Sequence, residues 1–168
     1  MASVPLALTL TVRDLTLDDV ADLDWSGSSS HLTHVVEHVV AAEQGTCRVL
    51  GVVAPNGLII AKGGVLFDLP ESFGDRDAGL LWMLAVRESW QSVGVGTVLV
   101  GALEQAARDR GRAYAVLGVE HDNPRAAALY RRLGYATSGS TLDGWSIGHR
   151  TQYVTVTTLM EKPLTPAH

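Results

Sequence analysis

Hydrophobic positions along the chain follow strand-like runs in some segments and a helical repeat in others. Residues 80–86 are all apolar, which is typical of a strand at the centre of a sheet covered on both faces. Apolar residues recur every three or four positions from Leu32 to Val40 and from Val95 to Ala106, which predicts a helix with one apolar face in each segment. Segment 91–97 joins the apolar strand to the second of these helices.

Glycine, proline and capping residues delimit the remaining predicted elements. Strands are expected over 8–15, 47–54, 58–69, 113–120, 135–142 and 152–161, and further helices over 17–23 and 124–133. Expected N-caps are Thr16, Ser30 and either Asp122 or Asn123; expected helix ends are Gly45, Gly111 and Gly134; Pro55-Asn56-Gly57 predicts a hairpin turn. Residues 70–77 and 143–151 are expected to be loops. The order β-α-α-β-β-β-α-β-α-β-β predicts one mixed α/β domain over 1–168.

Composition narrows the classes of function. The 168 residues include 46% hydrophobic and 18% charged residues, and the formal net charge is −5, which argues against non-specific nucleic-acid binding. Cys47 is the only cysteine, so an internal disulfide is excluded and a reducing cytoplasm is expected. We expect no signal peptide, because no Lys or Arg precedes Arg13 and Thr9 interrupts the apolar stretch 4–10. We expect no membrane span, because the run 80–86 is far too short to cross a bilayer.

Segment 91–97, Gln-Ser-Val-Gly-Val-Gly-Thr, is the strongest candidate for a ligand site. Glycines let a backbone approach a ligand closely, and the N–H groups at a helix start favour an anion. A nucleotide triphosphate loop would need a lysine after its last glycine, whereas Thr97 follows Gly96. A dinucleotide loop would need a third glycine where Leu99 stands. A tight turn with no ligand remains the alternative when the segment is taken alone.

A second motif gives the segment a specific interpretation. Gln91-x-x-Gly94-x-Gly96 after a central strand resembles the acetyl-CoA loop of the GNAT superfamily of N-acetyltransferases. About thirty residues further on, Asn123, Tyr130 and Gly134-Tyr135 resemble the second signature of that family. The resemblance covers 80–135 strongly. It implies a single domain of the α+β type, with a mixed central sheet of six or seven strands and helices on both faces.

The resemblance implies where acetyl-CoA binds. Its pantetheine arm would pair along Leu84, Ala85 and Val86, and Asn123 would bond the same arm or act only as a helix cap. Its pyrophosphate would lie on the backbone of the turn, formed by Gln91, Ser92, Val93, Gly94, Val95, Gly96 and Thr97. Many family members carry Arg or Lys in this turn. Since this chain has none there, binding would depend on backbone N–H groups.

The resemblance also implies a catalytic role for Tyr130, as the general acid that protonates the leaving CoA thiolate; the alternative is an aromatic that only packs at the edge of the core. A strand amide near Val86 would stabilise the oxyanion. The general base is less clear: some family members place a carboxylate where this chain has Gly118. Glu120 lies on the same strand face and is the candidate base, while Glu88, Asp77, His149 and a water relay remain alternatives.

Three further groups of residues have alternative interpretations. His31, His34 and His38 share a polar stripe that could hold a metal or face the acceptor, although a solvated stripe is the default and we expect no metal. Trp145, His149 and Arg150 could line a pocket or form a surface hairpin or dimer contact, and the acidic loop 71–77 could attract a cationic amine or simply be solvated. The expected function is acetyl transfer to a small-molecule or peptide amine. The alternative is a non-catalytic acyl-CoA-binding module.

Overall fold

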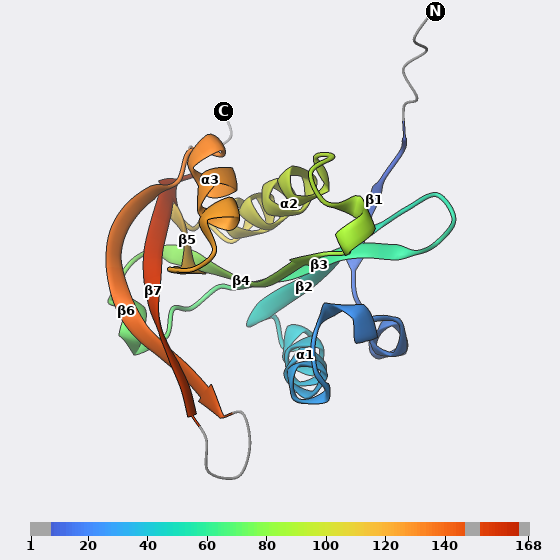
Figure 1. Cartoon of the computed structure of the whole chain (residues 1–168), viewed down its shortest axis with the longest axis horizontal. Helices are drawn as coiled ribbons and strands as arrows, with labels where there is room; N and C mark the ends of the chain where they lie inside the picture. The colour runs from blue at the N-terminus through green and yellow to red at the C-terminus, as the bar shows by residue number, and fades with distance from the viewer. Residues whose placement is uncertain (1–7, 147–151, 165–168) are drawn as a thin grey trace, which may run out of the picture. The chain divides into compact units, whose positions relative to one another are not determined.

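The computed structural model describes residues 8–146 and 152–164, in which seven strands are hydrogen-bonded in the order β1-β2-β3-β4-β5-β7-β6 (Figure 1). The strands are β1 Thr11–Asp14, β2 Cys47–Val53, β3 Ile59–Leu66, β4 Ala78–Val86, β5 Tyr114–Glu120, β6 Ala136–Ser146 and β7 Gln152–Pro163. The α-helices are α1 Ser29–Ala42, α2 Val95–Asp109 and α3 Pro124–Arg132. Because β4 and β5 are parallel while the β1–β2, β5–β7 and β6–β7 pairs are antiparallel, the sheet is mixed, as predicted.

Two compact units make up this single α/β fold, and each is described by itself. The first contains the chain up to Val65 together with Met83–Leu103. The second contains Leu66–Trp82 and the chain from Glu104 onwards. Strand β4 and helix α2 are each divided between the two units.

The first unit buries one face of α1 against β2 and β3. Val35 and Val39 of α1 join Leu15, Leu23, Val49 and Ile59 in one apolar cluster, as the helical repeat predicts. On the other side, a Cβ placed on Gly63 would lie 3.1 Å from Leu103 Cδ1, so the glycine lets α2 approach β3 closely. Figure 1 shows α1 and α2 on opposite sides of β2 and β3. The expectation of helices on both faces is therefore confirmed in this unit.

Several helix boundaries differ from the prediction. Segment Leu17–Asp22 is a 3-10 helix (η1) after Thr16, and a second one (η2) follows at Asp24–Ser26. Ser28, not Ser30, caps α1, because its hydroxyl oxygen accepts the N–H of His31 while Ser30 already lies inside the helix. The α-helix ends at Ala42, and Gly45 with φ 76° closes the following turn.

The second unit is built around β5 and the β6–β7 hairpin, with α3 beside them (Figure 1). Ala115, Val116 and Leu117 of β5 and Met160 of β7 are buried in its core. The prediction that 143–151 form a loop is wrong for 143–146, because these residues pair with 152–155 and extend β6 to Ser146. Strand β3 ends at Leu66 rather than at 69, and short 3-10 helices lie at Glu71–Phe73 (η3) and Glu88–Trp90 (η4).

Candidate active site

The glycine turn of the first unit lies directly before α2, as the sequence indicated. Helix α2 begins at Val95, so the first-turn N–H groups of Val95, Gly96 and Thr97 have no acceptor in a preceding turn. The first turn of α2 contains no acidic residue that would repel an anion. Ser92, with φ 64°, and Gly94, with φ 92°, both have left-handed backbones, which bend the chain sharply into the helix. The turn has the local geometry of an anion site.

Gln91 ties the turn to the end of β4. Its Nε2 donates a hydrogen bond of 3.0 Å to the carbonyl oxygen of Val86. Residues Gln91, Ser92, Val93 and Gly94 are exposed, whereas Val95 is buried and anchors the start of α2. The side chain at 91 therefore shapes the loop and leaves the loop backbone accessible to a ligand.

Strand β4 departs from regular geometry before Leu84, Ala85 and Val86. Its ladder with β5 runs from the Ala78–Tyr114 pair to the Leu81–Leu117 pair, and Met83 then has φ 55°. A positive φ is a genuine outlier for a bulky residue and is typical of a bulge that redirects a strand near a functional site. The change of course at Met83 was not predicted from the sequence.

A buried lysine stabilises this irregular segment. Lys62 of β3 has no exposed surface, and its Nζ donates a hydrogen bond of 2.9 Å to the carbonyl oxygen of Met83. Burial away from water lowers the pKa of the Lys62 ammonium to about 8. Sequence reasoning missed Lys62; the available signal was a lone charged residue inside the apolar run 59–66.

The three histidines of α1 do not gather into a metal site. His34 Nδ1 lies 3.1 Å from Glu37 Oε2, and His38 Nδ1 lies 2.7 Å from the carbonyl oxygen of His34. His31 is half-buried, and burial together with the charge of Lys62 lowers its pKa. Over residues 8–146 and 152–164, no group of three or more His, Cys, Asp or Glu side chains could hold a metal ion.

In the second unit, Asn123 caps α3 as expected, and Pro124 occupies the first helical position. The side-chain oxygen of Asn123 accepts the N–H of Ala126 over 3.1 Å, and the Asn123 N–H donates to the carbonyl of Glu120 over 3.0 Å. A turn thus connects the candidate base Glu120, the last residue of β5, to the cap. The Asn123 amide nitrogen takes no part in the cap, because a cap uses only the side-chain oxygen.

The space beside Gly118 is limited by Thr157. A Cβ on Gly118 would lie 2.6 Å from Cγ2 of Thr157 on β7, closer than real contacts allow. Glu120 is paired in register with Thr157 and is half-buried. Of the two positions on this strand face, 120 therefore holds a carboxylate as the structure stands, whereas a side chain at 118 would require the Thr157 side chain to move.

Tyr130 is almost completely buried in α3. It is 8% exposed, and burial raises the pKa of its phenol, so the group is protonated at neutral pH. Its ring packs edge-on against Tyr135, with 5.9 Å between the ring centroids. These properties suit a proton donor, and equally a packing aromatic.

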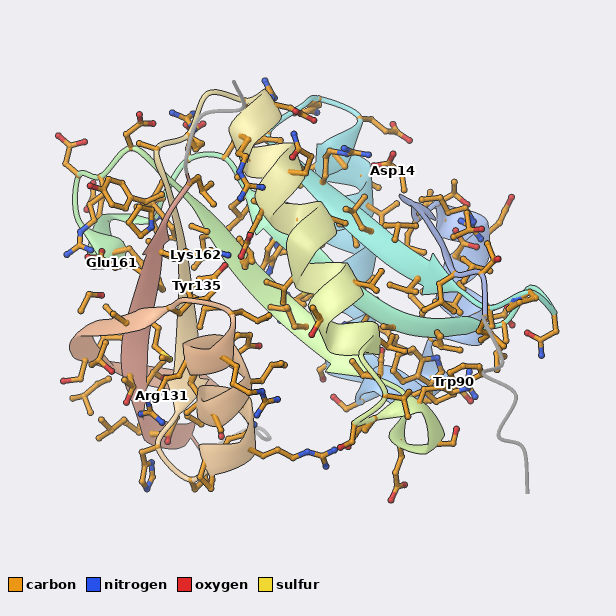
Figure 2. All side chains as sticks on the ribbon, turned by 90° about the horizontal axis from the view of Figure 1, so that it is seen from above. Asp14, Trp90, Arg131, Tyr135, Glu161 and Lys162 are labelled. Carbon is orange, nitrogen blue, oxygen red and sulfur yellow. The ribbon has the colours of Figure 1, made fainter. Side chains whose placement is uncertain are left out.

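Tyr135 belongs to a buried polar network that fixes its ring. Its hydroxyl donates to Glu104 Oε1 over 3.0 Å, and Lys162 Nζ donates to both Glu104 oxygens over 3.0 Å. Figure 2 shows Lys162 beside Tyr135, and Lys162 Nζ lies 5.7 Å from the centre of the Tyr135 ring. Burial, together with the Glu104 carboxylate, strongly raises the pKa of Tyr135. Sequence reasoning missed Glu104 and Lys162, because their pairing spans 58 residues.

The other candidate site residues predicted from the sequence lie in different environments. Asp77 accepts a hydrogen bond of 3.2 Å from Arg112, whose guanidinium also donates to Asp68. Glu88 is exposed in η4. His149 and Arg150 lie outside the described residues, and so does the side chain of Trp145, although its backbone belongs to β6.

Comparison with known proteins supplies the family. The model of the Acetyltransferase (GNAT) family matches residues 13–135. The chain therefore belongs to the GNAT acetyltransferase family. None of the helices in the described part of the chain is long and apolar enough to cross a membrane.

Individual relatives agree with this assignment. A mycothiol acetyltransferase from Saccharomonospora viridis is 38% identical over 68 residues, which are 40% of this chain and 22% of that protein. The ribosomal-protein-S18-alanine N-acetyltransferase of Escherichia coli has a TM-score of 0.67 and 22% identity, covering 95% of this chain and 97% of the other. A phosphinothricin acetyltransferase from Sinorhizobium meliloti, solved in complex with acetyl-CoA, has a TM-score of 0.72 and 16% identity, covering 93% and 89%. At these identities the two structures show a shared fold.

Proposed function

We propose that this protein transfers the acetyl group of acetyl-CoA to a primary amine by direct attack on the thioester. The observation that carries the proposal is the turn before α2, where exposed backbone, two left-handed residues and a helix start follow an irregular strand. This combination favours a ligand that carries a pyrophosphate and an extended arm. Family membership identifies such a ligand as acetyl-CoA.

The proposed cofactor contacts divide between backbone and side chain. The N–H groups of the turn from Gln91 to Thr97 would hold the pyrophosphate, and the backbone of Leu84, Ala85 and Val86 would pair with the pantetheine arm. Asn123 would bond the same arm through its amide nitrogen, because its oxygen is engaged by Ala126. Since residues 91–97 contain no Lys or Arg, affinity should depend weakly on salt compared with a loop that carries a cation.

The proposed chemistry needs a proton acceptor, an oxyanion donor and a proton donor. Glu120 would take the proton of the attacking ammonium group, directly or through water, and the neutral amine would then attack the thioester carbonyl. The N–H near Val86 would stabilise the tetrahedral oxyanion. As that intermediate collapses, the carbon–sulfur bond breaks and Tyr130 would protonate the leaving thiolate.

The proposed acceptor is a small-molecule amine or a peptide amine. Among the structural neighbours, one name indicates a protein alanine as acceptor and another indicates phosphinothricin. The mycothiol acetyltransferase matches over 22% of its length, so its substrate does not transfer to this chain. The single cysteine supports the expectation of a reducing, cytoplasmic location, and a homodimer remains a hypothesis.

Release of CoA thiol from acetyl-CoA, measured across a panel of small amines and peptides, tests this function. Amine-dependent release, with an N-acetylated product detected by mass spectrometry, is the expected result. The rival function is a non-catalytic acyl-CoA-binding module. Calorimetric binding of acetyl-CoA without release on any amine would favour that rival.

A further inference from the structure

The end of helix α3 directs Tyr135 towards Tyr130. The Tyr135 N–H donates to the carbonyl oxygen of Tyr130 over 2.9 Å, and the Gly134 N–H donates to that of Arg131 over 3.1 Å. Gly134 has φ 96°, the left-handed backbone that this type of helix ending requires. In such an ending the residue after the glycine frequently packs on the residue five positions before it. Here those two residues are both tyrosines.

The two tyrosine rings meet edge to face. Their centroids are 5.9 Å apart and their planes are inclined by 66°. Tyr130 and Tyr135 are both buried. Because protein interiors are close-packed, the position of the Tyr135 ring constrains the position of the Tyr130 ring.

Tyr135 is also anchored at its hydroxyl end. The hydroxyl donates to Glu104 Oε1 over 3.0 Å, and the buried Glu104 carboxylate accepts Lys162 Nζ at both oxygens (Figure 2 shows Tyr135 and Lys162). Arg108 Nη2 lies 3.4 Å from the same carboxylate. A hydrogen bond to an ionised acceptor is stronger than one between neutral groups. A phenylalanine at 135 would complete the helix ending equally well, so the hydroxyl and its charged partners call for a further role.

The two phenols differ in what they can do with their protons. The Tyr135 proton is already donated to Glu104, and burial together with that carboxylate strongly raises the pKa of Tyr135. Burial raises the pKa of Tyr130 without a contribution from a carboxylate. Tyr135 is therefore a poor proton donor to a thiolate, and its hydroxyl serves to hold its own ring in place.

We propose that Tyr135, anchored by Glu104 and Lys162, is a positioning residue that fixes the Tyr130 phenol for proton donation to the leaving thiolate. This inference rests on the acid role of Tyr130 in the proposed function. A proton donor must lie within hydrogen-bond reach of its acceptor, and a misplacement of about 1 Å can cost about a hundredfold in rate. The ring contact and the backbone hydrogen bond carry the constraint from Tyr135 to Tyr130.

Two substitutions at Tyr135 test the positioning role in the kinetics of amine-dependent CoA release. Tyr135→Leu removes the ring and should lower kcat about tenfold, while the KM for acetyl-CoA stays within about twofold of wild type, because the phenol is misplaced and the cofactor site is intact. Tyr135→Phe keeps the ring contact and removes only the bond to Glu104. It should therefore lower kcat less, by about threefold.

The Tyr130→Phe background separates positioning from a general loss of structure. Since no phenol is left at 130 to position, Tyr135→Leu should change kcat by less than about twofold in this background. An equal fold loss in both backgrounds would overturn the positioning role and leave the proposed function standing. Unchanged turnover in Tyr130→Phe itself would overturn the acid role, and the positioning role with it.

The flip rate of the Tyr130 ring tests the same contact without any acetylation. The chain has four tyrosines, so ¹³C-tyrosine labelling yields few ring resonances, and Tyr130→Phe assigns the one required. In Tyr135→Leu the flip rate, measured by NMR exchange, should rise about tenfold or more, because the ring has lost its neighbour. An unchanged rate would overturn the positioning role even if the enzyme is active.

Phe67→Leu is the matched control. Phe67 is a buried aromatic of the same unit, and its ring lies 4.4 Å from the Arg110 guanidinium carbon. The variant should lower the Tm while leaving kcat and the Tyr130 flip rate as in wild type. A fall in kcat equal to that of Tyr135→Leu would show that any loss of packing in this unit has the same effect, and would overturn the positioning role.

Discussion

Lys62 Nζ donates a hydrogen bond of 2.9 Å to the carbonyl oxygen of Met83, a residue with φ 55° in the middle of β4. The bond joins a buried charge to the one irregular point of a central strand. A left-handed methionine is strained, and a buried ammonium is costly, so each needs compensation. The pair places a polar group beside the strand segment proposed to bind pantetheine.

The first prediction concerns the pH dependence of stability. Burial lowers the pKa of Lys62 to about 8 in the folded state, against 10.5 for an ordinary lysine. Between these values the unfolded chain binds more protons, so the stability of wild type rises with pH. Relative to Lys62→Met, wild type should gain about 2 kcal/mol in the free energy of unfolding between pH 7.5 and pH 10. Urea denaturation at both pH values measures this difference.

The lysine pKa can also be measured directly. Lys62 and Lys162 are the two lysines of the chain, so ε-¹³C labelling yields two resonances, and Lys62→Met assigns them. A Lys62 midpoint near the ordinary value of 10.5 would contradict the burial-induced shift.

Much of the fold was predictable because it depends on local periodicity. The apolar repeat located α1 and α2, and the asparagine–proline pair at 123–124 located the start of α3. The strand status of 143–146 was missed because its glycine and polar residues resemble a loop, while its pairing with β7 depends on residues further along the chain.

Less of the candidate site was predictable. The glycine turn and the positions of Tyr130 and Asn123 come from motifs that are contiguous or nearly so. The burial of Lys62, the left-handed Met83 and the steric conflict at Gly118 depend on tertiary neighbours, which periodicity does not report. Sequence patterns therefore predicted the proposed acetyl-CoA site but not the polar residues around β4.

The second prediction tests the glycine turn with two glycines of the same chain. Gly94 has φ 92°, so Gly94→Ala should cost about 1 kcal/mol of stability and weaken acetyl-CoA binding about tenfold by altering the turn. Gly101 lies inside α2 with open space around its Cβ position, so Gly101→Ala should stabilise by about 1 kcal/mol and leave binding unchanged. Calorimetry with acetyl-CoA and thermal unfolding give both quantities. Equal acetyl-CoA affinities in the two variants would show that the turn does not contribute to the binding site.

The third prediction concerns the network around Glu104. Glu104→Gln removes the charge that accepts Lys162 and Tyr135, and should lower the free energy of unfolding by about 3 kcal/mol. Adding Lys162→Met removes the stranded ammonium and should restore about 1 kcal/mol. The exposed Gln105→Ala serves as the control and should change stability by less than about 0.5 kcal/mol. If the losses in the free energy of unfolding caused by Glu104→Gln and by Lys162→Met simply add in the double variant, the two residues are not coupled and the network is contradicted.

The fourth prediction tests the acid role of Tyr130. Tyr130→Phe keeps the ring that packs on Tyr135 but removes the proton, so turnover should fall about tenfold or more while acetyl-CoA affinity is retained. Because burial raises the pKa of Tyr130, its phenol should stay protonated below pH 10 in wild type. Turnover should therefore not fall through loss of this proton donor in that range. Tyr114→Phe, on an exposed tyrosine of β5, is the matched control. Unchanged turnover in Tyr130→Phe would leave the residue a packing role only.

The last prediction concerns the general base. A side chain at Gly118 would meet the Thr157 side chain, whereas Glu120, in register with Thr157, is accommodated at the end of β5. If Glu120 takes the amine proton, Glu120→Gln should lower kcat/KM at pH 7 by about a hundredfold, and a higher pH should recover part of the loss by supplying free amine. Glu88→Gln and Asp77→Asn, made in parallel, test the other carboxylates. A loss in one of these variants instead would move the base to that residue, and near-wild-type rates in all three would favour a water relay. The pH profile distinguishes a lost base from a distorted site, because only the former is rescued as the amine deprotonates in solution.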